Sequence, residues 1–188
     1  MVQYAEAFEP PGGYGAAPIP VDPQVQQWFQ AVDSDRSGKI TSRELQQALV
    51  NGNWSHFSDE ACRLMIAMFD RDNSGTIDIY EFQQLWNYIH QWKSIFERYD
   101  ADRTGHIEQQ ELMRALSDMQ YRLSPNFVST AIAKFDRTRK SLTFDNFIVF
   151  CVQLKLITDA FMARDTNRSG QITIGYEDFL SLAILNKP

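Results

Sequence analysis

The 188-residue sequence predicts an all-α protein built from five copies of one helix–loop–helix unit. Three observations predict this fold. A short signature rich in Asp and Gly recurs five times, apolar residues recur at helical spacing before the signatures, and two long stretches between signatures contain neither Gly nor Pro. We therefore expect helices joined by polar loops, with strand limited to short bridges between loops.

Composition narrows the class of protein. Hydrophobic residues make up 44% of the chain and aromatic residues 13%, which is enough to bury a core. The formal charge of −6 at pH 7 argues against binding to nucleic acid. Apolar runs fall short of the ~18 residues of a membrane-spanning helix, and the N-terminus lacks a secretory signal pattern, so we expect a cytosolic protein.

Candidate groups for catalysis are scarce in this sequence. Cys62 and Cys151 lie among apolar residues, so we expect two reduced core thiols rather than a disulfide. His56, His90 and His106 are scattered and pair with no plausible nucleophile, and the chain has no phosphate-binding glycine loop. We therefore expect that the protein is not an enzyme.

The chain begins with a tail that differs from the rest. Residues 1–23 hold eight Gly or Pro residues, which predicts a flexible segment, and residues 24–188 hold all of the repeats. Asp22 and Pro23 predict the N-cap and first residue of a helix. The stripe of this first helix consists of Val25, Trp28, Phe29 and Val32.

Three copies of the signature are complete, and they occupy residues 33–44, 70–81 and 100–111. Each has Asp at positions 1 and 3, Ser or Thr at 5, Gly at 6, Ile at 8 and Glu at 12, which is the pattern of an EF-hand calcium loop. Calcium takes six to eight oxygens, so the chain must curl tightly, and Gly at position 6 permits the turn. The spacing therefore predicts three Ca²⁺ sites.

The predicted ligands are side chains at positions 1, 3, 5 and 12, the backbone carbonyl at position 7, and acidic side chains at position 9 that act through water. Thr41 at position 9 leaves the first loop with one acidic group fewer, so we expect it to bind more weakly. The predicted ligand residues are Asp33, Asp35, Ser37, Lys39 and Glu44 in the first loop, Asp70, Asp72, Ser74, Thr76, Asp78 and Glu81 in the second, and Asp100, Asp102, Thr104, His106, Glu108 and Glu111 in the third.

The fourth and fifth copies are degenerate. Residues 136–146 lack the glycine and are one residue short, so we expect no calcium there. Residues 165–178 begin well, but Tyr176 stands at position 12. Asp178 takes the register of the missing Glu after a two-residue insertion. We favour a structural role for this fifth loop over a physiological calcium site.

The spacing of the copies predicts how they are joined. Ser58 and Ser124 start further helices, whereas residues 82–99 and 147–164 are each long enough for one uninterrupted helix that leaves one loop and enters the next. Loops then pair first with second and third with fourth, through short β-bridges at position 8.

The fifth loop has no partner, and its apolar helix would be exposed, so we predict a dimer rather than a monomer with a folded-back tail. The apolar residues of that helix are Phe179, Leu180, Leu182, Ala183, Ile184 and Leu185.

Five EF-hands, shared helices, a degenerate fourth loop and a fifth loop with two extra residues resemble the penta-EF-hand family, from about Val21 to the end. The resemblance implies a calcium-dependent adaptor that forms a homodimer or a heterodimer with a related chain. It also implies a cytoplasmic protein that associates with endoplasmic-reticulum and vesicle membranes during ER-to-Golgi transport. Family members bind proline-rich segments in aromatic pockets, and the matching residues are Trp54, Phe82, Trp86 and Trp92.

Three alternatives stay open at this point. Phe82 and Trp86 also belong to an ordinary core stripe with Leu85 and Ile89, and we favour this packing role over peptide binding. The chain could be the calcium-binding regulatory subunit of a cysteine protease, in which case it should copurify with the large protease chain. A passive calcium buffer is the third alternative, and it should show no calcium-dependent gain in the binding of a hydrophobic dye.

Overall fold

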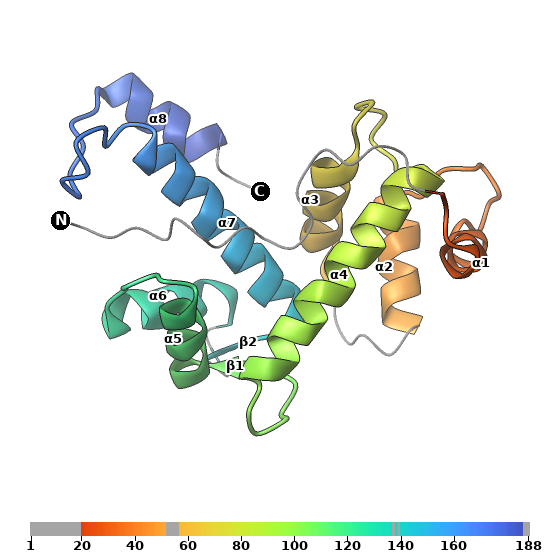
Figure 1. Cartoon of the computed structure of the whole chain (residues 1–188), viewed down its shortest axis with the longest axis horizontal. Helices are drawn as coiled ribbons and strands as arrows, with labels where there is room; N and C mark the ends of the chain where they lie inside the picture. The colour runs from red at the N-terminus through yellow and green to blue at the C-terminus, as the bar shows by residue number, and fades with distance from the viewer. Residues whose placement is uncertain (1–19, 52–56, 137, 139, 186–188) are drawn as a thin grey trace. The chain divides into compact units, whose positions relative to one another are not determined.

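Figure 1 shows the computed structural model, which describes residues 20–51, 57–136, 138 and 140–185. Most of the predicted tail, and Trp54, lie outside these described residues. The chain divides into two compact units. Among the described residues, the N-terminal lobe holds 20–98 and 143–145, and the C-terminal lobe holds 99–142 and 146–185.

The N-terminal lobe is built from four helices, and N-cap residues explain where the first and the third begin. Asp22 accepts a hydrogen bond from the Gln24 N–H at 2.7 Å, and Pro23 follows as the first helical residue, as predicted. Ser58 caps the third helix in the same way, through the Ala61 N–H. The helices are α1 (Pro23–Val32), α2 (Ser42–Asn51), α3 (Asp59–Phe69) and α4 (Ile79–Tyr99).

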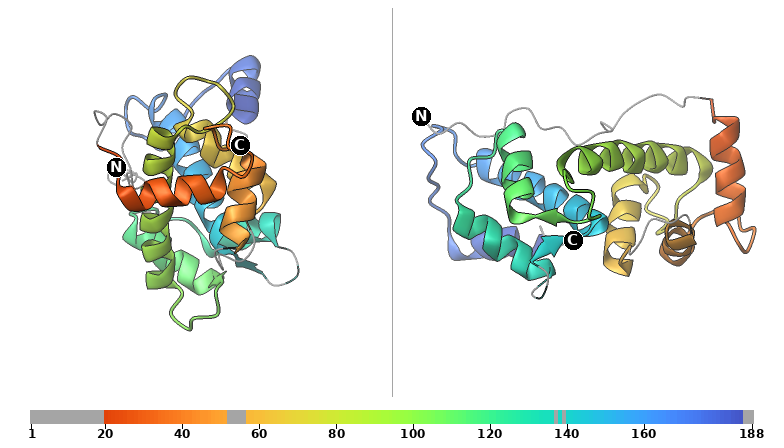
Figure 2. Two further views of the ribbon diagram at one scale, coloured as in Figure 1. Left: turned by 90° about the vertical axis from the view of Figure 1, so that its right-hand side faces the viewer. Right: turned by 90° about the horizontal axis from the view of Figure 1, so that it is seen from below.

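The C-terminal lobe contains the remaining helices and a small sheet. Ser124 caps its second helix, with Pro125 as the first helical residue. The elements are β1 (Ile107–Glu108), α5 (Gln109–Asp118), α6 (Pro125–Phe135), β2 (Ser141–Leu142), α7 (Phe144–Met162) and α8 (Tyr176–Leu185). Figure 2 shows α4 and α7 in further views.

The two long helices confirm the prediction that neighbouring units share helices. α4 runs unbroken for 21 residues and α7 for 19. Both begin three residues before the predicted starts, at Ile79 and Phe144, and α7 ends two residues before the predicted end, at Met162. Stretches without Gly or Pro keep every backbone hydrogen bond of a helix available, which explains their length.

Short antiparallel bridges join the loops in the predicted pairs. Ile40 and Ile77 exchange backbone hydrogen bonds of 2.8 and 2.9 Å, which pairs the first loop with the second. Ile107 pairs with Leu142, and so joins the third loop to the fourth. All four side chains are 0% exposed. The bridge residues are therefore also core residues of their lobes.

Both cysteines are free and buried, as predicted. Burial raises the pKa of the Cys62 thiol to about 12, and burial likewise raises the pKa of Cys151. A protonated thiol is a poor nucleophile, so neither residue is suited to nucleophilic chemistry. Within the described residues, no helix has the length and apolar character needed to cross a membrane.

We expect Ile77→Ala to lower the free energy of unfolding by about 3 kcal/mol, because the change leaves a cavity beside the bridge. Urea unfolding followed by circular dichroism measures the effect. Tyr80→Ala is the matched control, because Tyr80 lies three residues away but is 53% exposed. Equal losses in the two variants would show that the bridge residues are not central to the core.

Candidate metal centres

The loop backbone gathers donors around the first aspartate. In the first loop Gly38 has φ of +79° and Arg36, at position 4, has φ of +57°. These left-handed residues turn the N–H groups of Ser37 and Gly38 inward, and both donate to the Asp33 carboxylate, at 3.0 and 2.9 Å. The left-handed backbone at position 4 was not predicted from the sequence, because that position holds Arg or Asn rather than Gly. The second and third loops repeat the arrangement around Asp70 and Asp100.

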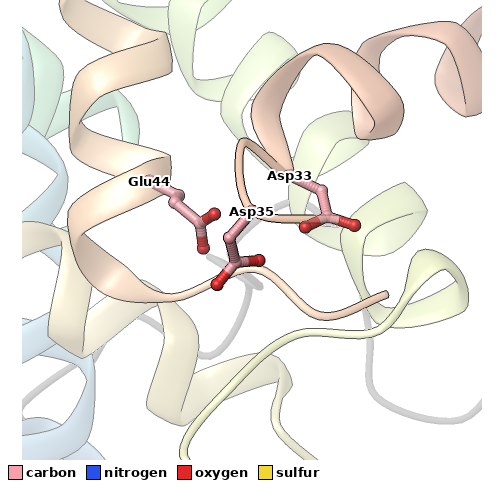
Figure 3. Close-up of side chains that lie close together, drawn as sticks. All are labelled: Asp33, Asp35 and Glu44. Atoms are coloured by element: carbon pink, nitrogen blue, oxygen red, sulfur yellow. The ribbon is translucent and has the colours of Figure 1, made fainter. Parts of the chain in front are cut away.

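Each complete loop brings three carboxylates together. Figure 3 shows Asp33 and Asp35 on the loop beside Glu44, which comes from α2. One oxygen from each lies within 4.8 Å of the others. Two oxygens bound to the same calcium ion, at about 2.3–2.6 Å each, lie at most about 5 Å apart, so this spacing fits one ion. The equivalent clusters are Asp70, Asp72 and Glu81, and Asp100, Asp102 and Glu111.

The glutamate at position 12 is held by both ends of its loop. In the first loop, the Ser34 N–H donates to Glu44 Oε1 and the Thr41 N–H donates to Glu44 Oε2, each at 3.0 Å. Partial burial alone would raise the pKa of Glu44, but the hydrogen bonds from Thr41 and Ser34 outweigh it, so the pKa lies below its usual value. Glu81 and Glu111 accept the same pair of backbone hydrogen bonds, at 2.8–3.0 Å. The ligand that must close the shell is thus already positioned.

The predicted ligands at positions 5 and 7 also lie side by side. The Ser37 hydroxyl donates to the Lys39 carbonyl at 2.9 Å. Ser74 makes the same contact with Thr76, and Thr104 with His106, each at 3.2 Å. These distances suit neighbouring oxygens in one coordination shell. Residues of all three loops therefore fit a calcium ion.

The acidic residues at position 9 lie at the starts of helices in this structure. Asp78 accepts hydrogen bonds from the Tyr80 and Glu81 N–H groups, at 2.8 and 2.9 Å, and so caps α4. Glu108 is likewise the residue before α5. Neither belongs to the three-carboxylate clusters of the described residues. Their predicted contribution through water stays a prediction.

A lysine from the first loop contacts the second, which the sequence analysis missed. The Lys39 ammonium donates to Asp72 Oδ2 at 3.1 Å and to the Ser74 hydroxyl at 3.3 Å, which are the ligands at positions 3 and 5 of the neighbouring loop. The hydrogen bond to Asp72 raises the pKa of Lys39. Hydrogen bonds from Ser74 and then Lys39 lower the pKa of Asp72. Only the antiparallel loop pairing brings residues 33 positions apart together, so no local motif signals this contact.

The fourth loop keeps the turn and the bridge of a calcium loop but lacks the closing glutamate. Lys140 adopts φ of +54° two residues before Leu142, where the complete loops place glycine. Asp145 is buried, and its carboxylate accepts a hydrogen bond from the Ser58 N–H at 3.0 Å. The acidic group nearest the end of this loop thus supports the start of α3.

The fifth loop has the first half of a calcium loop but lacks the carboxylate that would close it. Asp165 is 3% exposed and accepts the N–H groups of Ser169 and Gly170, at 2.9 and 2.8 Å, as in the complete loops. Tyr176, however, is 76% exposed, and Asp178 lies in the first turn of α8. Within the described part of the chain, the fifth loop has no cluster of three acidic groups.

Two of the four candidate partner-binding aromatic residues are buried, which agrees with the core role that we favoured over peptide binding. Phe82 and Trp92 are 0% exposed, so in this structure they are core residues and offer no surface to a partner. Trp86 is half-buried and contacts Trp28, with ring centroids 4.4 Å apart. An apolar stripe on a helix has the same sequence pattern whether it faces the core or a partner, so the sequence left both alternatives open.

We expect Glu81→Gln to abolish one of three calcium-binding events, because the amide cannot supply two anionic oxygens. Calorimetric titration of calcium into the wild type, Glu44→Gln, Glu81→Gln and Glu111→Gln measures the number of sites. Glu97→Gln, on the exposed side of α4, is the control and should retain all sites. An unchanged titration for Glu81→Gln would show that the second loop does not bind calcium.

We also expect Lys39→Met to raise calcium affinity at the second loop by about two- to fivefold, the range typical of one exposed charge pair. The ammonium otherwise competes with calcium for Asp72 and Ser74. Calorimetry in the Glu44→Gln background isolates the effect from the first loop. Lys93→Met removes a charge on α4 and should leave the affinity unchanged. A fall in affinity for Lys39→Met would contradict this competition.

Family models and known relatives agree with the geometry. The model described as "EF-hand domain pair" matches residues 22–86, and "EF-hand domain" matches residues 91–121. Human peflin (Homo sapiens) is 48% identical over 172 residues, and peflin of Xenopus laevis is 46% identical over 170 residues. These alignments cover 90% and 89% of this chain but only 61% and 60% of the peflins. The chain thus spans about three-fifths of their length.

Human sorcin is 42% identical over 180 residues, which cover 90% of both chains. A solved structure described as a homolog of programmed cell death 6 protein from Leishmania major Friedlin superposes with a TM-score of 0.75 at 29% identity. It covers 87% of this chain and 94% of that one. Together with the three calcium loops and the two degenerate ones, these similarities show that the chain belongs to the penta-EF-hand family of calcium-binding proteins.

Proposed function

We propose that this protein is a calcium sensor that binds partner proteins when calcium is bound. The observation that carries the proposal is the place of the twelfth-position glutamates, each of which lies in the first turn of the helix that leaves its loop. An ion that binds the carboxylate therefore acts on that helix. A passive buffer needs no such connection.

The helix α4 strengthens this argument. Glu81, a ligand of the second loop, lies in its first turn, and Asp100, the first ligand of the third loop, follows its last residue, Tyr99. A movement of α4 caused by an ion at one loop therefore reaches the ligands of the other. This arrangement favours a sensor whose sites respond together over independent storage sites.

We further propose that the protein dimerises through its fifth unit, with a second copy or a related chain. Three large apolar side chains of α8 support this. Tyr176 is 76% exposed, Phe179 56% and Leu180 36%. Among the described loops, bridges join first to second and third to fourth, so the fifth has no described bridge partner. A two-fold pairing of fifth units would cover this surface.

Charge gives a further reason for calcium-dependent association. Three bound calcium ions carry +6 against a formal charge of −6, so the loaded protein is close to neutral. Lower self-repulsion favours association with proteins and membrane surfaces. We propose, as the family resemblance implies, a cytoplasmic adaptor of ER-to-Golgi transport whose partners include proline-rich segments.

We expect calcium to increase the fluorescence of a hydrophobic dye and the fraction of protein that sediments with membrane vesicles. The triple variant Glu44→Gln, Glu81→Gln, Glu111→Gln should lose both responses, and Glu97→Gln should keep them. If the wild type gives the same dye signal with calcium and with chelator, the protein is a buffer and the sensor proposal fails.

We expect Phe179→Asp to shift the protein from dimer to monomer, because a buried charge without a partner destabilises an apolar interface. Sedimentation velocity measures the oligomeric state. Tyr80→Asp, which changes a comparably exposed residue at the start of α4, is the control and should leave the dimer intact. A wild type that sediments as a monomer at all concentrations would contradict self-association.

A further inference from the structure

The C-terminal lobe contains a cleft of about 280 Å³ between α6 and α7, far in sequence from the calcium ligands. Its lining is apolar except for Thr130, Lys134 and Gln153. Phe127 and Ile157, which belong to the lining, are 46% and 47% exposed. Small-molecule sites are commonly apolar clefts of roughly this size with a few polar groups, so the nature of those polar groups decides what the cleft can take.

Gln153 is the unusual member of the lining. It is only 9% exposed, and its Oε1 accepts a hydrogen bond from the Lys134 ammonium at 3.2 Å. An ammonium can only donate, so this contact determines which end of the amide faces Lys134. The amide Nε2 is buried and has no hydrogen-bond partner among the described residues. A buried donor left unpaired is costly, and an acceptor on a ligand would satisfy it.

Two hydrogen-bond donors, from Lys134 and Gln153, lie next to each other in an otherwise apolar cleft. Lys134 supplies a positive charge and Gln153 a neutral N–H, while the Thr130 hydroxyl already donates to the Asn126 carbonyl at 2.9 Å. A matching ligand therefore has one anionic acceptor group and an apolar remainder. A peptide fits less well, because its backbone carries polar groups along its whole length and each would need a partner.

We propose that this cleft binds a monocarboxylate with a hydrocarbon chain, of the fatty-acid class. The carboxylate accepts hydrogen bonds from Lys134 Nζ and Gln153 Nε2, and the chain lies against Phe127, Phe150 and Ile157. The site needs neither calcium nor dimerisation for its chemistry. It gives the protein a second ligand, distinct from the ions of its loops.

Calorimetric titration of the full chain with octanoate, decanoate and dodecanoate, below their micelle concentrations, tests the proposal. The buffer contains chelator, because calcium forms insoluble soaps with long-chain carboxylates. We expect one site whose affinity rises about fourfold per added methylene until the cleft is full. Decanol, which has the same chain without the charge, should bind at least tenfold more weakly than decanoate. Equal affinity for decanol and decanoate, or no saturable binding, would overturn the proposal.

Variants separate the carboxylate contacts from general apolar binding. We expect Lys134→Met and Gln153→Leu to lower decanoate affinity toward that of decanol while decanol affinity is retained, because the cleft stays apolar. The ¹³C signal of carboxyl-labelled decanoate should shift on binding to the wild type and lose that shift in the variants. Lys155→Met, also on α7 but outside the lining, is the matched control. Decanoate affinity equal to wild type in both lining variants would place the carboxylate elsewhere and refute the assignment.

Discussion

The hydrogen bonds that hold the twelfth-position glutamate at both ends of its loop are the constraint on which each calcium site depends. In the first loop the Glu44 carboxylate joins the Ser34 and Thr41 N–H groups, and Glu81 and Glu111 repeat this pattern. These contacts place the carboxylate beside the two aspartates and anchor the start of the exit helix in one step. Ion position and helix position are linked through one side chain.

Pairing of the loops gives this local link a wider reach. The Ile40–Ile77 bridge places the first two loops back to back, and this puts the Lys39 ammonium on Asp72 and Ser74. The Lys39 carbonyl belongs to the first loop, where it accepts a hydrogen bond from the Ser37 hydroxyl. One residue thus contacts the ligands of two sites. Its backbone carbonyl is a predicted ligand of one site, and we expect its ammonium to compete with calcium at the other.

The fourth and fifth units show that the loop fold does not require the ion's ligands. Lys140 takes the left-handed turn without glycine, and Leu142 pairs with Ile107 as an intact loop would. Asp165 still collects its backbone donors. Both units lack the closing glutamate. The bridge to Ile107 still stabilises the fourth loop, and hydrogen bonds to Asp165 still shape the fifth. The C-terminal lobe also has surfaces that lie outside the calcium loops, namely the exposed face of α8 and the cleft between α6 and α7.

The sequence by itself determined the helices, the three calcium loops and the order in which loops pair. These features depend on residues close together in the chain: Asp22 and Pro23 at a helix start, Gly38 at a turn, and the absence of Gly and Pro across α4. The tertiary structure alone decided which apolar residues are core and which are surface. In the folded chain Phe82 and Trp92 are buried and Phe179 is exposed. Folding also brings Lys39 into hydrogen-bond contact with Asp72, and Lys134 into hydrogen-bond contact with Gln153. Helical periodicity marks an apolar face without saying what covers it, and contacts between distant residues exist only once the helices have packed.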